Sequence, residues 1–183
     1  MIDQKFQNID KIFSISSEVE FESMAIEVFK FQYKNNKVYQ QYCDYLNTDI
    51  NFVIKLKDIP FLPISFFKSH TVICGDEKQT EKEFSSSGTT GMVTSIHYVK
   101  EISIYEQSFI KGFEYFYGPI NDYIVLGLLP SYLEREGSSL IYMVDKLIKL
   151  SNNSESGFFL DDYEALLKVI KGNKSSKKII LLG

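Results

Sequence analysis

The 183-residue sequence predicts an α/β fold in which N-terminal helices precede a mixed or parallel sheet with flanking helices. Three observations support this prediction. Apolar residues near the N-terminus recur at three- and four-residue steps, as they do in amphipathic helices. Further along the chain, short apolar runs of strand length alternate with segments of helical periodicity. The composition, 44% hydrophobic and 24% charged, is that of a globular domain that buries a core.

Residues 1–58 are predicted to form an N-terminal helical region. Residues 21–29 carry one apolar face and residues 38–46 carry a second. The Asn35–Asn36 pair between them favours a turn, since asparagine tolerates the backbone angles that turns require. The two faces consist of Phe21, Met24, Ala25, Val28 and Phe29, then Val38, Tyr42, Tyr45 and Leu46. We therefore expect a pair of helices that pack through these faces into the core.

Residues 59–183 are predicted to form the α/β portion. At its start, Pro60 and Pro63 disfavour a helix interior, so residues 59–74 are expected to be extended and to lead into a strand. Residues 75–82 are polar and charged, which is typical of a solvated turn. The chain is thus expected to reach the sheet through an extended entry segment and a turn.

Two strands are expected at residues 83–86 and 95–100, on either side of a glycine-rich loop. A helix is predicted from residue 101 to residue 117, because Gly118 and Pro119 form a helix stop. Residues 122–129 are almost wholly apolar, as expected of a strand that is buried on both faces.

The last part of the chain continues the alternation. We expect a helix at residues 138–150, a strand at 157–160, a helix at 161–170 and a strand at 178–182. In an open α/β sheet, the ligand-binding loops follow the carboxyl ends of the strands. Because the final strand stops at Gly183, the sequence predicts a portion that is truncated at its C-terminus.

Charge and cysteine content exclude several classes of function. The net charge of −4 argues against nucleic acid as a partner, since phosphate neutralisation needs clustered Lys and Arg. Cys43 and Cys74 have no CxxC or Cys/His companions, which indicates reduced thiols rather than a disulfide or a metal site. The sequence has neither a signal-peptide run nor a stretch long enough to span a bilayer. We therefore expect a cytoplasmic protein with no membrane span.

A glycine-rich loop, FSSSGTTG, carries the strongest functional signal. Its two glycines let consecutive backbone amides converge on a phosphate, and its five hydroxyls can donate to phosphate oxygens or contribute oxygen to a Mg²⁺ shell. The loop is not a Walker A motif, because no Lys follows the second glycine. We expect it to bind ATP with Mg²⁺, and the alternative is a flexible hairpin turn. The candidate residues are Ser85, Ser86, Ser87, Gly88, Thr89, Thr90 and Gly91.

In the order of its residues, SSSGTTG resembles the phosphate-loop signature of the adenylate-forming superfamily, which includes acyl-CoA synthetases. Residues 59–72 (IPFLPISFFKSHTV) and 129–147 (LPSYLEREGSSLIYMVDKL) resemble its LuxE-type acyl-protein synthetase branch. Members of that branch use ATP to form an acyl-adenylate and pass the acyl group to a cysteine thiol. The resemblance implies part of the large domain of such an enzyme, a carboxylic (fatty) acid substrate and an acyl-accepting protein partner.

The sequence departs from the superfamily pattern in two respects. Met92, Val93 and Thr94 replace the Pro-Lys-Gly that usually follows the phosphate loop. The later family elements, including the ribose-binding Asp, the lid with its catalytic Lys and the acyl-accepting cysteine, have no counterpart before Gly183. The chain alone is therefore expected not to complete the reaction, and no catalytic residue is assigned.

Two further residues are candidates for substrate binding. Arg135 lies in the loop after the buried strand, and Ser138 opens a helix whose N-terminal amides can hold an anion. The alternatives are a solvated charge paired with a neighbouring Glu for Arg135 and a helix cap for Ser138. His97, just past the glycine loop, is more typical of a structural residue than of a catalyst.

The leading hypothesis is the N-terminal portion of an adenylate-forming acyl-protein synthetase. The alternative from another class is a non-catalytic nucleotide- or acyl-binding module, which the missing lid elements favour.

Overall fold

The computed structural model describes residue 6 and residues 8–86, 94–130, 137–173 and 176–183. The chain forms two compact units, Met1–Ile104 and Tyr105–Gly183. The domain division predicted between residues 58 and 59 falls inside the first unit.

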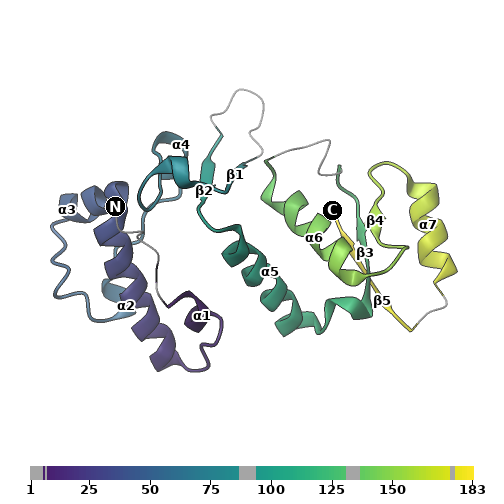
Figure 1. Cartoon of the computed structure of the whole chain (residues 1–183), viewed down its shortest axis with the longest axis horizontal. Helices are drawn as coiled ribbons and strands as arrows, with labels where there is room; N and C mark the ends of the chain where they lie inside the picture. Colours follow the sequence, from purple (N-terminus) through teal and green to yellow (C-terminus); the bar gives the residue numbers. More distant parts are fainter. Residues whose placement is uncertain (1–5, 7, 87–93, 131–136, 174–175) are drawn as a thin grey trace. The chain divides into compact units, whose positions relative to one another are not determined.

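The first unit opens with the helices α1 (Ile9–Ile12), α2 (Glu18–Asn35) and α3 (Lys37–Tyr45) (Figure 1). Ser17 caps α2 by accepting a hydrogen bond from the Glu20 amide. Asn36 ends α2 and caps α3, since its side chain accepts from the Tyr39 amide at 3.1 Å. The predicted helix pair and the turn between its members are confirmed.

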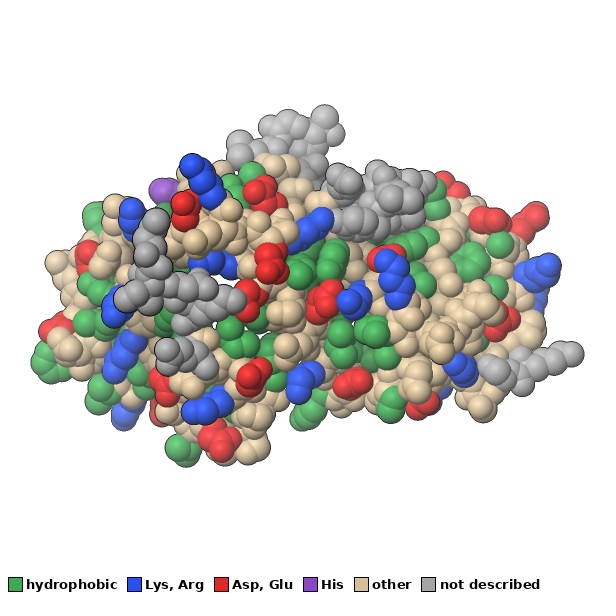
Figure 2. All heavy atoms as spheres, in the orientation of Figure 1, with side chains coloured by type: hydrophobic (Ala, Val, Ile, Leu, Met, Phe, Trp, Pro, Cys, Tyr) green, Lys and Arg blue, Asp and Glu red, His purple; other side chains and the backbone are tan. Residues whose placement is uncertain are grey.

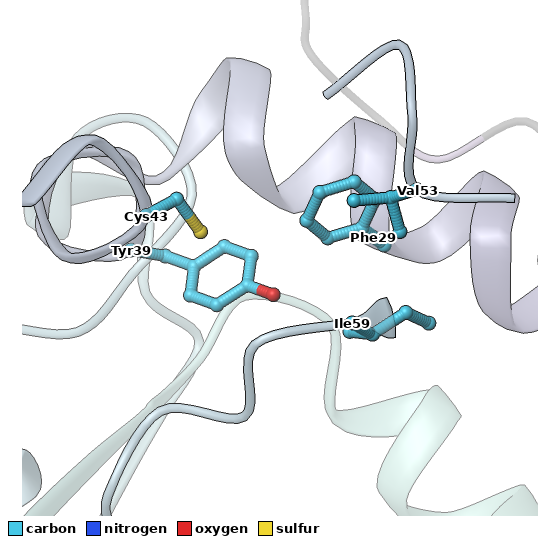
Figure 3. Close-up of a cluster of buried hydrophobic side chains, with 5 residues drawn as sticks. All are labelled: Phe29, Tyr39, Cys43, Val53 and Ile59. Carbon is cyan, nitrogen blue, oxygen red and sulfur yellow. The ribbon is translucent and has the colours of Figure 1, made fainter. Parts of the chain in front are cut away.

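The helix pair encloses a small hydrophobic core (Figure 3). The buried members are Phe29 from α2, Tyr39 and Cys43 from α3, and Val53 and Ile59 from the chain that follows. The Phe29 and Tyr39 rings pack edge to face, with their centroids 6.1 Å apart. The Tyr39 hydroxyl donates to the Pro60 carbonyl at 2.7 Å, so the core also fixes the start of the proline-containing segment.

The segment after this core differs from the prediction. It contains the short helices η1 (Leu56–Asp58), α4 (Phe66–Ser69) and η2 (Glu77–Gln79), and no strand lies within the described residues 59–74. The prediction of extended chain leading into a strand was therefore wrong for α4. Proline restricts the residue before it and lacks an amide hydrogen, yet its carbonyl can open a helical turn. The Pro63 carbonyl accepts from the Phe66 amide at 3.0 Å.

A two-stranded antiparallel hairpin, β1 (Lys82–Ser85) and β2 (Ile96–Val99), completes the first unit. Phe84 points into the interior and is 4% exposed, whereas its neighbours on β1 are more exposed. Both strands lie where the sequence predicted them, and they flank the glycine-rich loop as expected.

The second unit is built on a parallel three-stranded sheet of order β4-β3-β5 (Figure 1). Its strands are β3 (Tyr123–Gly127), β4 (Gly157–Phe158) and β5 (Lys178–Leu182). The helices are α5 (Ile102–Tyr117), which begins at the end of the first unit, the short η3 (Ile120–Asp122), α6 (Ser139–Ser151) and α7 (Tyr163–Gly172). Strand β4 is shorter than predicted, because the chain turns at Leu160, which has a positive φ of 44°.

Strand β3 is central and buried on both faces, as its apolar run predicted. Tyr123 and Val125 pack with α5 and α6 on one face, while Ile124 and Leu126 pack with Leu166 of α7 on the other. This alternation follows from the two-residue period of a strand. Helices cover both faces of a parallel sheet, so the α/β fold class is confirmed.

Among the described residues, no helix has the length and apolar character needed to cross a membrane. Acidic and basic side chains are intermingled on the face shown in Figure 2.

Candidate functional site

The glycine-rich loop is joined to the hairpin by a reciprocal pair of serines. The Ser86 amide donates to the Ser95 carbonyl at 3.0 Å, and the Ser95 amide donates to the Ser86 hydroxyl oxygen at 3.0 Å. These bonds extend the β1–β2 ladder, whose last paired residues are Ser85 and Ile96. Ser86, near the start of the loop, and Ser95, just before β2, are therefore held together by two hydrogen bonds.

Two of the seven predicted loop residues, Ser85 and Ser86, lie within the described structure, and both are exposed. The Ser86 hydroxyl oxygen already accepts one hydrogen bond, and a hydroxyl can still donate its own hydrogen to a phosphate oxygen. The remaining predicted residues, Ser87, Gly88, Thr89, Thr90 and Gly91, lie outside the described residues.

Ser95 is a site residue that sequence reasoning missed. It is 8% exposed, and its Oγ lies 3.4 Å from Nε2 of His97. The only sequence signal was the short hydroxyl pair Thr94–Ser95 just before β2. His97 itself stacks on Phe67 of α4, with ring centroids 4.3 Å apart and planes at 18°. The structural role that the sequence favoured for His97 fits this packing.

A second candidate region lies at the carboxyl end of the parallel sheet. Strand β3 pairs with β4 on one side and with β5 on the other. After β3, the chain therefore adds β4 at one edge of β3 and then crosses to add β5 at the other edge. In open α/β sheets, ligands bind beyond the carboxyl ends of the strands at such a switch point. Here the switch point lies between β3 and β5, and the residues that follow β3 lead to the start of α6.

Ser138 stands at the start of α6 and caps it. Its hydroxyl oxygen accepts from the Ile141 amide at 3.4 Å, so the capping alternative considered for Ser138 fits the geometry. The preceding Gly137 has a φ of +84°, which favours glycine at this position. Arg135 lies outside the described residues, so its predicted role as a substrate contact stays a prediction.

The first turns of α6 are fixed against α5 by polar contacts. The Tyr105 hydroxyl donates to the Ser139 carbonyl at 3.0 Å. Glu106 accepts from the Tyr142 hydroxyl at 2.7 Å and from Lys146 at 3.0 Å. The hydrogen bond from Tyr142, helped by Lys146, lowers the pKa of the Glu106 carboxyl, so this carboxyl is ionised at neutral pH. These contacts fix the amino-terminal half of α6 against α5.

Neither cysteine is placed for acyl transfer. Cys43 is fully buried in the first core, and burial raises the pKa of its thiol. Burial also raises the pKa of Cys74 to about 11, and the Cys74 thiol donates to Oε1 of Gln32 at 3.1 Å. Both thiols are therefore protonated and poorly nucleophilic at neutral pH.

Within the described ranges, no group of three or more His, Cys, Asp or Glu side chains could hold a metal ion. The exposed hydroxyls of Ser85 and Ser86 suit a phosphate and could supply oxygen to a Mg²⁺ ion bound with it.

Comparison with known proteins bears directly on these sites. The chain matches the family model described as acyl-protein synthetase, LuxE, over residues 13–179. It is 32% identical over 88 residues to a long-chain-fatty-acid–luciferin-component ligase of Vibrio harveyi, a match that covers 48% of this chain and 23% of that ligase. It is also 32% identical over 73 residues to the protein of the same name from Photorhabdus luminescens, covering 40% of this chain and 62% of that protein.

No solved structure matches the chain significantly. In these two matches, the chain spans less than two thirds of the length of either relative. The family match, by contrast, begins just before α2, ends within β5 and includes both candidate sites. It confirms the resemblance to the LuxE-type branch, and the chain belongs to the LuxE acyl-protein synthetase family.

Proposed function

We propose that this chain is the N-terminal portion of a ligase that activates a fatty acid with ATP for transfer to a thiol on an acceptor protein. The observation that carries the proposal is the FSSSGTTG sequence, which starts at the end of β1 and precedes β2, in a chain that the LuxE family model matches over residues 13–179. The names of the two relatives supply the substrate class, since both are called long-chain-fatty-acid ligases.

In this proposal, the phosphate loop binds the triphosphate of ATP and later releases pyrophosphate. Backbone amides that converge on phosphate oxygens stabilise the charge that develops there, and hydroxyls add donors without adding net charge. The hydrogen bonds between Ser86 and Ser95 hold these two residues together before any ligand binds. The loop therefore loses less conformational entropy when it binds phosphate. Mg²⁺ would neutralise part of the triphosphate charge when it is bound.

The chemistry consists of two displacements. A carboxylate oxygen attacks the α-phosphorus of ATP, the bond to the β-phosphate oxygen breaks, and pyrophosphate leaves with that electron pair. A thiolate then attacks the acyl carbonyl carbon, and AMP leaves with the electrons of the acyl–oxygen bond. We assign phosphate binding to residues 85–91 and a contact with the substrate carboxylate or a phosphate to Arg135 and Ser138. The acceptor thiol belongs to neither Cys43 nor Cys74, whose pKa values are raised by burial.

The test is calorimetric titration of this chain with Mg-ATP, in parallel with a Gly88→Ala, Thr89→Ala double variant. We expect the wild-type chain to bind and the folded double variant to lose most of that binding. Gly112→Ala serves as a matched control, because this glycine lies on α5 with nothing within 4 Å of an added Cβ. A folded wild-type chain without any affinity for Mg-ATP would contradict the phosphate-loop assignment for this chain.

A non-catalytic nucleotide- or acyl-binding module is the second candidate function. The match to the Vibrio harveyi ligase covers 23% of that protein, so nucleotide binding and catalysis are tested separately. Acid-dependent exchange of labelled pyrophosphate into ATP separates the two candidates. Exchange with long-chain acids supports the ligase, whereas tight Mg-ATP binding without exchange supports the module.

A further inference from the structure

The two histidines of the chain stack on consecutive phenylalanines of α4. His70 stacks on Phe66 with centroids 4.9 Å apart and planes at 21°, within the same short segment. His97 stacks on Phe67 at 4.3 Å and 18°, although the two residues are far apart in sequence. The second stack therefore ties β2 of the hairpin to α4.

His97 also contacts the serine that closes the glycine loop. Its Nε2 lies 3.4 Å from Oγ of Ser95, whose carbonyl and amide hold Ser86 through two 3.0 Å hydrogen bonds. A continuous series of contacts thus joins four residues in the order Phe67, His97, Ser95 and Ser86. The series runs from α4 to the residues at both ends of the loop.

We propose that His97 is a positioning residue for nucleotide binding. Its ring, stacked on Phe67, fixes the end of β2 so that Ser95 keeps Ser86 in register. In this role His97 acts through its contacts with Phe67 and Ser95. The amides of a phosphate loop bind well only when its two ends are held in place, because a small displacement misaligns several hydrogen bonds at once. This inference rests on the proposed function, and it assigns α4 a role in that function.

The experiment uses the full chain with three single substitutions. His97→Asn removes the stacked ring and keeps polar atoms, while His97→Phe keeps a ring that can stack on Phe67. His70→Asn is the matched control, because it removes the other stack on α4, which joins two residues of the same short segment. Each variant is examined by amide hydrogen exchange at Ser86 and Ser95, followed by NMR, and by calorimetric titration with Mg-ATP.

We expect His97→Asn to speed exchange at both serine amides and to weaken Mg-ATP binding, each by about tenfold, in line with the loss of one aromatic stack. His97→Phe should retain most of both properties, and His70→Asn should leave both unchanged. The inference is overturned if His97→Asn leaves exchange at Ser86 and Ser95 unchanged, if His97→Phe behaves like His97→Asn, or if His70→Asn has the same effect.

The exchange measurement does not depend on the nucleotide. If the wild-type chain fails to bind Mg-ATP, the proposed function falls. The exchange rates at Ser86 and Ser95 then still decide whether His97 positions the ends of the loop.

Discussion

Ser86 and Ser95 are bonded to each other twice, with the Ser86 amide donating to the Ser95 carbonyl and the Ser95 amide donating to the Ser86 hydroxyl oxygen, both at 3.0 Å. One of the bonds depends on a side chain. Ser86, which is predicted to bind phosphate, is therefore also a structural partner of Ser95.

Ser86→Ala should destabilise the hairpin. The substitution removes the acceptor of the Ser95 amide, and Ser95 is 8% exposed, so water replaces the lost partner poorly. We expect a loss of about 1–2 kcal/mol in the free energy of unfolding, measured by urea denaturation. Ser86→Thr keeps the hydroxyl oxygen and should recover most of this loss. Ser65→Ala is the control, since Ser65 is exposed and makes no capping hydrogen bond, and equal stability of the two alanine variants would refute the prediction.

Alanine at two glycines of the second unit should have opposite effects. An added Cβ at Gly127, the last residue of β3, would lie 2.9 Å from Cδ1 of Phe158 and 3.2 Å from Cγ1 of Val144. We expect Gly127→Ala to cost about 1–3 kcal/mol through overpacking. Gly112→Ala, at an open position on α5, should stabilise by about 0.5–1 kcal/mol. Urea denaturation curves of both variants provide the measurement. An unchanged free energy of unfolding for Gly127→Ala would show that the Phe158 ring moves aside freely.

Substitutions at Ser138 separate its capping role from a substrate contact. Ser138→Ala removes the cap of α6 and should cost about 1 kcal/mol, or about 2–4 °C in Tm. Ser138→Asp retains a capping oxygen and should keep the wild-type Tm, whereas its negative charge should weaken any contact with a substrate carboxylate. Ser154→Ala, at an exposed position, provides the baseline. A Tm for Ser138→Ala equal to that baseline would mean that the cap contributes little.

Cys74 should resist alkylation at neutral pH. Burial raises the pKa of its thiol from 9.0 to about 11, so the folded chain holds about 100-fold less thiolate at this position than an unfolded chain near pH 7. The iodoacetamide rate, followed by mass spectrometry, should rise steadily as pH approaches 11. The raised pKa also predicts a stability contribution that is complete below the unfolded pKa and disappears as pH rises toward 11. Fast labelling of the folded chain at pH 7 would contradict the burial argument.

Much of the fold could be predicted because its signals are local. The apolar run of β3, the periodicity of α6 and α7, and the Gly118–Pro119 stop after α5 each depend on neighbouring residues. The helix α4 could not be predicted in this way, because Pro63 favours extended chain, although its carbonyl opens the helical turn that leads into α4. The second unit's strand order could not be predicted either, since it depends on which distant apolar segments pack together.

The site shows the same division between local and distant information. The type and order of residues 85–91 are enough, by themselves, to predict a phosphate loop. The partnership of Ser86 with Ser95 joins residues nine positions apart across a loop, and no residue pattern indicates it. The stack of His97 on Phe67 spans a still longer separation. Contacts of this kind arise from the way α4 meets the hairpin, which composition and periodicity do not specify.

The central position of β3 has a consequence for how the second unit forms. Its two neighbours are both parallel to it, and the partner on one side, β5, follows only after α6, β4 and α7 have been completed. Such pairings between distant segments slow folding, because the entropy of closing a long connection is lost before the strands gain contacts. The amide hydrogens of β3 should accordingly gain protection from exchange late during folding. Once β3 is hydrogen-bonded on both edges, they should be among the last in this unit to exchange with solvent.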